Sequence, residues 1–239
     1  MVTLTIDERE VQAQEGTMIL DVAKENNIYI PSLCTNDAVS PYGACRLCLV
    51  EVTKGKRDRL VASCLYPVEK GLIVKTNSER IMANRRAIME LLLARCPNVS
   101  EIQDLARRLG VKGTPFALED KKCILCALCV RACQEVVGVS AISLVNRGIN
   151  RELSTPFYEP SKVCIGCGSC AYICPTEAIQ FEDIEDTRFI NWPNNKMEFK
   201  LKKCKSCGNY WAPEKQIDHI AKQSNLDPEV FDVCPNCRD

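Results

Sequence analysis

The chain has 239 residues, and its 31 Lys and Arg balance 31 Asp and Glu, so the formal net charge is zero. This balance argues against a protein that coats nucleic acid or an acidic membrane surface, since both need an excess of basic groups. No segment approaches the roughly 18 apolar residues of a membrane span, and the opening MVTLTIDEREV lacks the pattern of a signal peptide, so we expect a soluble, cytoplasmic protein.

Residues 1–77 contain short alternating segments rich in Val, Ile and Leu, namely VTLTID, REVQA, CLVEVT, RLVASC and GLIVKT. These segments predict strands, and GTMILDVAKENN predicts one short helix capped near Thr17. Short strands with a single crossing helix indicate a small α+β domain.

The 17 cysteines are too many for a cytosolic protein unless they perform chemistry. A reducing cytosol keeps thiols from pairing, so clustered cysteines there more often bind metal. An extracellular disulfide framework is the alternative. It is disfavoured because C-x-x-C cysteines rarely bridge in structural disulfides and no export signal is present.

The first cysteine set has the spacing C-x10-C-x2-C-x15-C and comprises Cys34, Cys45, Cys48 and Cys64. Plant-type [2Fe-2S] ferredoxins use a tighter first gap with a similar order of elements. A four-cysteine zinc site is the alternative. The segment PSLCTNDAVSPYGACRLCLVEV resembles the N-terminal [2Fe-2S] domain of the large peripheral subunit of respiratory complex I. The same domain opens electron-transfer subunits of NAD-linked hydrogenases and formate dehydrogenases. This resemblance implies a β-grasp fold for residues 1–77.

Residues 78–118 read as a helical connector. Ser78 is placed to cap a first helix, Ser100 and Gln103 form a capping-box pattern for a second, and Gly110 is a natural stop. Several arginines, among them Arg80, Arg85 and Arg86, make these helices basic. A solvated face explains them better than a docking patch for an acidic partner.

Cys96 stands alone at the end of the first connector helix. AIMELLLAR resembles the end of the complex I helix that leads into a histidine and three cysteines holding a further [4Fe-4S] cluster. Cys96 stands about where that histidine would be, and the three cysteines are absent. The resemblance implies that this cluster has been lost. We expect Cys96 to be a spare thiol packed beside Leu92 and Leu93.

Residues 119–184 contain an internal repeat, in which CILCALCVRAC and CIGCGSCAYIC align from Cys123 to Cys164, an offset of 41 residues. Three cysteines two residues apart can bind one [4Fe-4S] cluster, while the fourth reaches the other cluster. One cluster is expected at Cys123, Cys126, Cys129 and Cys174. The second is expected at Cys133, Cys164, Cys167 and Cys170. The spacing disfavours a pair of zinc sites and resembles bacterial dicluster ferredoxins.

Residues 185–239 read as a linker, over 185–196, followed by a small metal-binding module. Two C-x-x-C hooks flank a helical segment, and their cysteines are Cys204, Cys207, Cys234 and Cys237. Four thiolates suit zinc and also suit another [4Fe-4S] cluster. The hook form favours zinc. His219 is expected to be an exposed helix residue rather than a ligand.

These sets predict one [2Fe-2S] and two [4Fe-4S] clusters, and we find no dinucleotide, phosphate-loop or hydrolase motif beside them. The expected architecture is α+β: a [2Fe-2S] β-grasp domain, a helical connector, a 2[4Fe-4S] ferredoxin domain and a small four-cysteine C-terminal module. The expected function is electron transfer within an NAD(P)H-linked oxidoreductase. The resemblance implies an FMN- and NAD(H)-binding flavoprotein partner and a further catalytic subunit, of a hydrogenase, formate dehydrogenase or bifurcating transhydrogenase. Ferredoxin is a further candidate partner.

Two alternatives from other classes stay open. One is a free ferredoxin-type carrier, which the neutral charge disfavours because carriers use acidic charge for steering. The other is a redox-sensing regulator, which the absence of a basic recognition helix disfavours.

Overall fold

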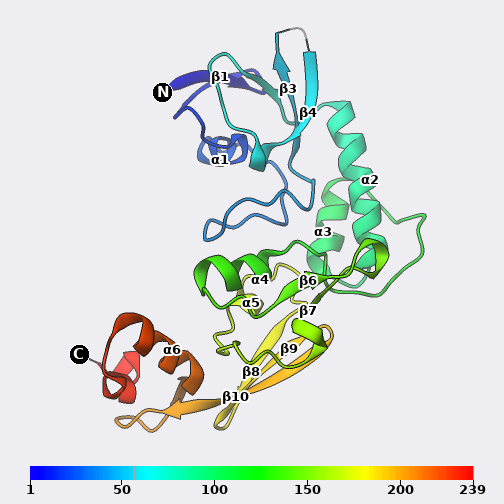
Figure 1. Cartoon of the computed structure of the whole chain (residues 1–239). Helices are drawn as coiled ribbons and strands as arrows, with labels where there is room; N and C mark the ends of the chain where they lie inside the picture. The colour runs from blue at the N-terminus through cyan, green and yellow to red at the C-terminus, as the bar shows by residue number, and fades with distance from the viewer. Residues whose placement is uncertain (56, 239) are drawn as a thin grey trace. The chain divides into compact units, whose positions relative to one another are not determined.

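A computed structural model describes residues 1–55 and 57–238, and it contains both helices and sheets. The chain divides into two compact units, residues 1–127 and 128–239, which are described separately (Figure 1). Among the described residues, no helix is long and apolar enough to span a membrane.

The first unit is built on a five-stranded sheet in the order β2-β1-β5-β3-β4. The outer strands pair antiparallel with their neighbours, whereas β1 and β5 are parallel. All five expected strands are confirmed, with bounds β1 Val2–Ile6, β2 Arg9–Ala13, β3 Leu49–Lys54, β4 Arg57–Ala62 and β5 Ile73–Lys75.

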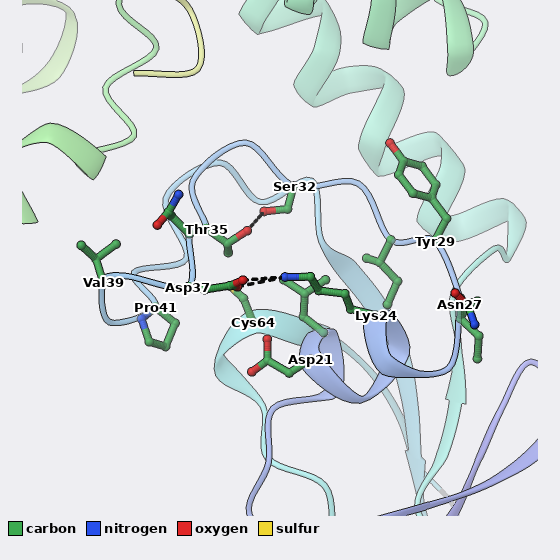
Figure 2. A pocket seen from close by; sticks show the side chains of 14 residues that line it. Asp21, Lys24, Asn27, Tyr29, Ser32, Thr35, Asp37, Val39, Pro41 and Cys64 are labelled. Carbon is green, nitrogen blue, oxygen red and sulfur yellow. Dashed lines mark hydrogen bonds and ion pairs between the residues drawn. The ribbon is translucent and has the colours of Figure 1, made fainter. Parts of the chain in front are cut away.

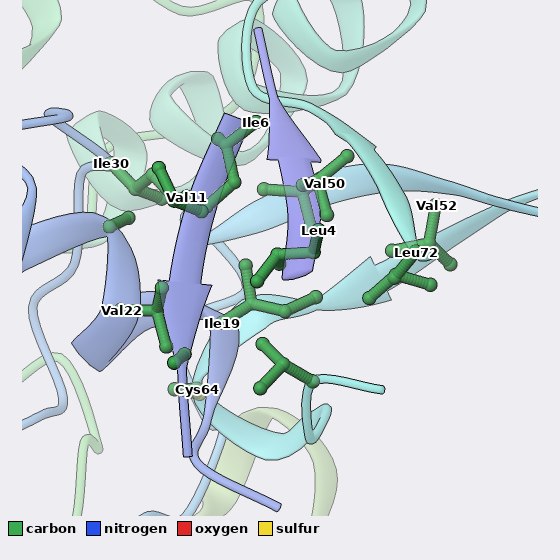
Figure 3. Packing of buried hydrophobic residues seen from close by; sticks show 14 of the residues in the cluster. Leu4, Ile6, Val11, Ile19, Val22, Ile30, Val50, Val52, Cys64 and Leu72 are labelled. Carbon is green, nitrogen blue, oxygen red and sulfur yellow. The ribbon is translucent and has the colours of Figure 1, made fainter. Parts of the chain in front are cut away.

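Helix α1 (Ile19–Glu25) packs on this sheet through Ile19 and Val22, which are fully buried against Leu4 and Val50 (Figure 3). The side chains come from strands whose burial alternates, so one face of the sheet forms a single apolar core with the helix. The expected cap at Thr17 is wrong: Met18 precedes the helix and gives no side-chain cap.

The connector forms two packed helices, α2 (Glu79–Arg95) and α3 (Ser100–Arg108). Ser78 caps α2, because its hydroxyl accepts a hydrogen bond from the Ile81 N–H at 3.2 Å. Gly110 follows α3 with φ of +73°, as expected for a helix stop. The capping box is wrong, since the Gln103 amide donates instead to the Pro97 carbonyl, at 2.7 Å.

Arg85 corrects the expectation of a solvated basic face. Its side chain is buried, with only 4% exposed. The guanidinium donates to the carbonyls of Leu47 at 2.9 Å, Thr76 at 3.0 Å and Leu49 at 2.8 Å. Burial lowers the pKa of Arg85. Arg85 therefore joins α2 to the segment that carries Cys48, whereas Arg80 on the same helix is exposed.

Cys96 ends α2 inside a second apolar cluster of the first unit. It is fully buried, together with Met89 and Val99, and Leu92 and Leu93 pack against the same cluster, as the sequence predicts. Burial raises the pKa of the Cys96 thiol to about 12, so the thiol stays neutral.

The second unit begins with a short helix and turns that carry the ferredoxin-like repeat, α4 (Leu128–Arg131), η2 (Ala132–Val136) and α5 (Ser169–Tyr172). Between the two halves lie η3 (Gly148–Asn150), η4 (Pro156–Tyr158) and a hairpin of β6 (Ser143–Val145) and β7 (Glu152–Ser154).

The expected linker at 185–196 is wrong, because these residues belong to a four-stranded antiparallel sheet. Thr187–Trp192 shows the alternating burial of a half-buried strand, and the following strand does the same. The sheet leads into helix α6 and the C-terminal turns. The bounds are β8 Gln180–Ile184, β9 Thr187–Trp192, β10 Asn195–Lys203, β11 Tyr210–Pro213, α6 Glu214–Ser224, η5 Pro228–Asp232 and η6 Pro235–Cys237. The remaining short element, η1 (Ser63–Leu65), carries Cys64 in the first unit.

Candidate iron–sulfur and metal sites

The first cysteine set comes together at one end of the five-stranded sheet. The Sγ atoms of Cys48 and Cys64 are 3.4 Å apart and share a hydrogen bond, which lowers the pKa of Cys48 to about 6 and raises that of Cys64. The Cys45 N–H donates to the Cys34 sulfur at 3.4 Å. Hydrogen bonding with Cys34 raises the pKa of Cys45. The four cysteines thus form two neighbouring pairs, in which the Cys45 N–H contacts the Cys34 sulfur and the sulfurs of Cys48 and Cys64 contact each other.

The segment after α1 surrounds an open groove that Cys64 also lines (Figure 2). An ion pair between Lys24 and Asp37, 2.9 Å long, crosses it, and the hydroxyls of Ser32 and Thr35 are 2.6 Å apart. These contacts hold the loop that contains Cys34 against the helix. The loop is therefore braced by polar side chains, while its cysteine is buried.

The loop between the cysteines has the same left-handed positions in both halves of the repeat. Gly166 and Gly168 have φ of +74° and +79°, and the residues aligned with them, Leu125 and Ala127, have φ of +57° and +61°. This left-handed conformation costs roughly 1–2 kcal/mol for a residue other than glycine. The first half therefore keeps the turn geometry between its cysteines despite that cost, which supports the repeat seen in the sequence.

Four cysteines of the second unit line one small cavity, namely Cys133, Cys164, Cys167 and Cys170. Its remaining walls are largely apolar. The Ala141 N–H donates to the Cys133 sulfur at 3.2 Å. Burial raises the pKa of Cys164 to about 11 and that of Cys170 to about 12. A buried, thiol-lined cavity with amide N–H groups on the sulfur atoms fits an iron–sulfur cluster.

The other predicted set is divided between the two units. Cys123 and Cys126 belong to the first unit, where Arg95 donates to the Cys123 carbonyl at 2.8 Å. Cys129 and Cys174 belong to the second unit. The assignment of these four cysteines to one cluster stays a prediction from their spacing.

The four-stranded sheet forms a wall of the cavity, a role that the linker interpretation missed. A Cβ on Gly166 would lie 2.6 Å from the Phe199 ring, and a Cβ on Gly168 would lie 3.2 Å from the ring of Phe181. Arg188 donates to the Gly166 carbonyl at 3.3 Å and forms two hydrogen bonds with Asp183. The alternation in KMEFKLKK is the sequence signal that could have revealed β10 and with it the sheet.

The C-terminal cysteines form the tightest group, with all four Sγ atoms within 4.8 Å of one another. The Sγ atoms of Cys207 and Cys234 are 3.9 Å apart. Backbone N–H groups of Cys234 and Cys207 lower the pKa of Cys204 to about 6. His219 is half-buried on α6 rather than exposed, and it is not part of this group. The close spacing of four cysteine sulfurs suits a metal ion.

Two family models match the chain. A 2Fe-2S iron–sulfur cluster binding domain matches residues 1–79. A 4Fe-4S dicluster domain matches residues 122–178, and a second match over 163–209 includes Cys204 and Cys207. The chain is therefore an iron–sulfur protein with both [2Fe-2S] and [4Fe-4S] binding domains.

The chain is 36% identical over 212 residues to the NADP-reducing hydrogenase subunit HndD of Solidesulfovibrio fructosivorans, covering 75% of this chain and 36% of that protein. It is 31% identical over 206 residues to a subunit of the NADH-quinone oxidoreductase of Rhizobium meliloti, covering 75% of this chain and 24% of that protein. The chain thus spans about a third or less of these relatives.

A solved structure of an NAD⁺-reducing [NiFe]-hydrogenase contains a similar chain, with 31% identity and a TM-score of 0.57. The match covers 64% of this chain and 74% of that one. The chain belongs to the family of iron–sulfur subunits found in NAD(P)-linked hydrogenases and NADH-quinone oxidoreductases. The resemblance inferred from the cysteine motifs is confirmed.

Proposed function

We propose that the chain relays electrons between a flavoprotein subunit and another redox centre of an NAD(P)H-linked oxidoreductase complex. One observation carries the proposal: each unit brings cysteine sulfurs together inside a segment that matches an iron–sulfur domain. When bound, such clusters accept and release electrons at potentials set by their surroundings. The role of the chain is then to hold the clusters, exclude water from them and present them to partner subunits.

Residues 1–77 would form a β-grasp domain whose [2Fe-2S] ligands are the first cysteine set. The mixed sheet crossed by one helix supports this fold. In a [2Fe-2S] cluster with four cysteine ligands, two thiolates bind each iron. The two neighbouring cysteine pairs support one iron at Cys34 and Cys45 and the other at Cys48 and Cys64.

Residues 119–184 would form the dicluster ferredoxin domain, linked to the first by the connector at 78–118. The cavity in the second unit supports one [4Fe-4S] cluster at Cys133, Cys164, Cys167 and Cys170. The constant repeat offset supports the sister cluster at Cys123, Cys126, Cys129 and Cys174.

Residues 185–239 would form a module that holds one zinc ion at the C-terminal cysteines. A tetrahedral zinc site with 2.3 Å bonds to sulfur has sulfur–sulfur edges of about 3.8 Å. The sulfur separations of 3.9 Å and below 4.8 Å agree with that size. A [4Fe-4S] cluster would hold its cysteine sulfurs farther apart, because each projects outward from a different iron. The dicluster match to residue 209 favours the cluster instead, so metal analysis must decide.

The partners are inferred from the relatives, which are subunits of NADP- and NADH-linked oxidoreductases. We expect an FMN- and NAD(H)-binding flavoprotein on one side and a subunit with a further redox site on the other. Hydrogenase, formate dehydrogenase and bifurcating transhydrogenase complexes are the candidate assemblies.

Anaerobic purification of the full chain tests the proposal. We expect about ten irons per chain, from one [2Fe-2S] and two [4Fe-4S] clusters, and about one zinc. About fourteen irons without zinc would replace the zinc assignment by a third [4Fe-4S] cluster. NADH should reduce the clusters only after a flavoprotein subunit is added. Reduction by NADH without flavin would contradict the electron-transfer role.

A further inference from the structure

Trp192 is the last residue of β9. Burial alternates along this strand, so that Arg188, Ile190 and Trp192 face inward. Ile190 and Trp192 line the cavity formed by the second [4Fe-4S] cysteine set, and Arg188 bonds to the Gly166 carbonyl in the same loop. Trp192, which points inward at the end of β9, therefore lines the proposed cluster site.

The indole N–H of Trp192 has no hydrogen-bond acceptor among the described residues. The side chain is only 7% exposed, and its Nε1 atom is shielded from solvent. Buried N–H donors nearly always have a partner, because losing the bonds to water without replacement is costly. A buried donor on the wall of a cavity lined by thiols indicates that its acceptor belongs to the bound group.

The four cysteines of this set line the same cavity as Trp192, and Cys164 and Cys170 are buried as Trp192 is. A thiolate bound to iron carries more negative charge than a thiol and is the stronger acceptor.

We propose that the indole N–H of Trp192 donates a hydrogen bond to a cysteine thiolate of the second [4Fe-4S] cluster and raises the reduction potential of that cluster. Hydrogen bonds to cluster sulfurs favour the reduced state, because reduction adds negative charge to those sulfurs. Trp192 is then a positioning residue that sets the reduction potential of one cluster in the electron relay. The inference rests on the proposed function, because it assumes a cluster at this site.

The chain offers a matched control in Trp211. Its indole nitrogen is also buried without a partner, but it lies on β11 beside Ala212, Ile217 and Phe231, in the apolar cluster next to α6. Trp192→Phe and Trp211→Phe therefore remove the same group from the same sheet. Trp192 lines the cluster cavity, whereas Trp211 is not among the residues that line it.

The experiment is an anaerobic redox titration of the full chain, followed by electron paramagnetic resonance. At the midpoint potential of the wild-type cluster, Trp192→Phe should lower the ratio of reduced to oxidised cluster about threefold to tenfold. The change should affect the reduction of one of the two [4Fe-4S] clusters. A tenfold change corresponds to about 59 mV for one electron. Trp211→Phe should leave both steps unchanged. Pulsed measurements should also lose one exchangeable proton coupling only in the Trp192 variant.

A second variant covers the case in which Trp192→Phe loses its cluster. Benzothienylalanine at position 192 replaces the indole N–H by sulfur and nearly keeps the shape of the side chain. It should lower the reduction potential of the same cluster. An unchanged potential in either cluster-containing variant would overturn the inference. So would an equal shift in both steps, which would indicate a general disturbance. If the wild-type chain assembles no second [4Fe-4S] cluster, the proposed ligand set is wrong, which is a separate result.

Discussion

Arg85→Lys should destabilise the first unit and the [2Fe-2S] site with it. The guanidinium donates three hydrogen bonds, to the carbonyls of Leu47, Leu49 and Thr76, and is almost fully buried. Leu47 and Leu49 flank Cys48, so the arginine ties α2 to the segment that carries one proposed ligand. A lysine ammonium is a single point of contact and can keep about one of these bonds.

The expected cost follows from the two bonds that lysine loses. A hydrogen bond to a charged group contributes about 1.5–3 kcal/mol, so Arg85→Lys should cost roughly 3–6 kcal/mol. Arg80 provides the control on the same helix. Its side chain is exposed and makes one 3.5 Å contact with Glu51, so Arg80→Lys should cost less than about 1 kcal/mol.

The assay is guanidinium unfolding of the full chain under anaerobic conditions, with midpoints compared at equal m-values. The [2Fe-2S] content should fall in Arg85→Lys, while the [4Fe-4S] content serves as an internal reference. The reasoning is refuted if Arg85→Lys and Arg80→Lys unfold within about 1 kcal/mol of each other and both keep the [2Fe-2S] cluster.

Three further predictions concern the other sites. Gly166→Ala should cost about 2–5 kcal/mol, from left-handed strain and from the clash with Phe199. Gly138→Ala, with a similar φ of +78° and open space, should cost only about 1–2 kcal/mol; equal thermal midpoints for the two would contradict the clash. Cys96→Ser should leave the iron count and the spectroscopic signal of every cluster unchanged. It should lower the free energy of unfolding in denaturant by about 1 kcal/mol. Loss of a cluster signal would show that the ligand sets are wrong. Chelation of the C-terminal zinc should remove about one zinc and expose the C-terminal module to protease, yet leave the cluster spectra intact; loss of a cluster signal instead would favour iron at that site.

The local sequence was sufficient to predict a strand or a helix end wherever the residues that decide it lie within a few positions of one another. Alternating Val, Ile and Leu located the five strands of the first unit, and Ser78 and Gly110 marked helix ends. The cap at Thr17 and the capping box at Ser100 failed: the Ile19 N–H donates to the Tyr66 carbonyl, and the Gln103 N–H donates to the Val99 carbonyl. A capping residue is a local preference that nearby backbone can override.

The linker interpretation failed for a different reason. Residues 185–196 contain Pro and Asn as well as charged residues, which are typical of loops, but the inward positions of β9 are Arg188, Ile190 and Trp192. An arginine at an inward position hides the apolar alternation from a pattern search. Its burial is possible because Asp183 and the Gly166 carbonyl receive its hydrogen bonds.

The sequence alone revealed the groups of cysteines, the repeat and the family resemblance, because these cysteines lie at short, repeated spacings along the chain. Only the tertiary structure decided which distant groups surround those ligands. Tertiary packing buried Arg85, set Trp192 on the wall of a cavity lined by cysteines and brought the C-terminal sulfurs within 4.8 Å of one another. Spacing along the chain says which cysteines can share a metal, whereas the separation of their sulfurs and the donors that face them depend on packing between segments far apart in sequence.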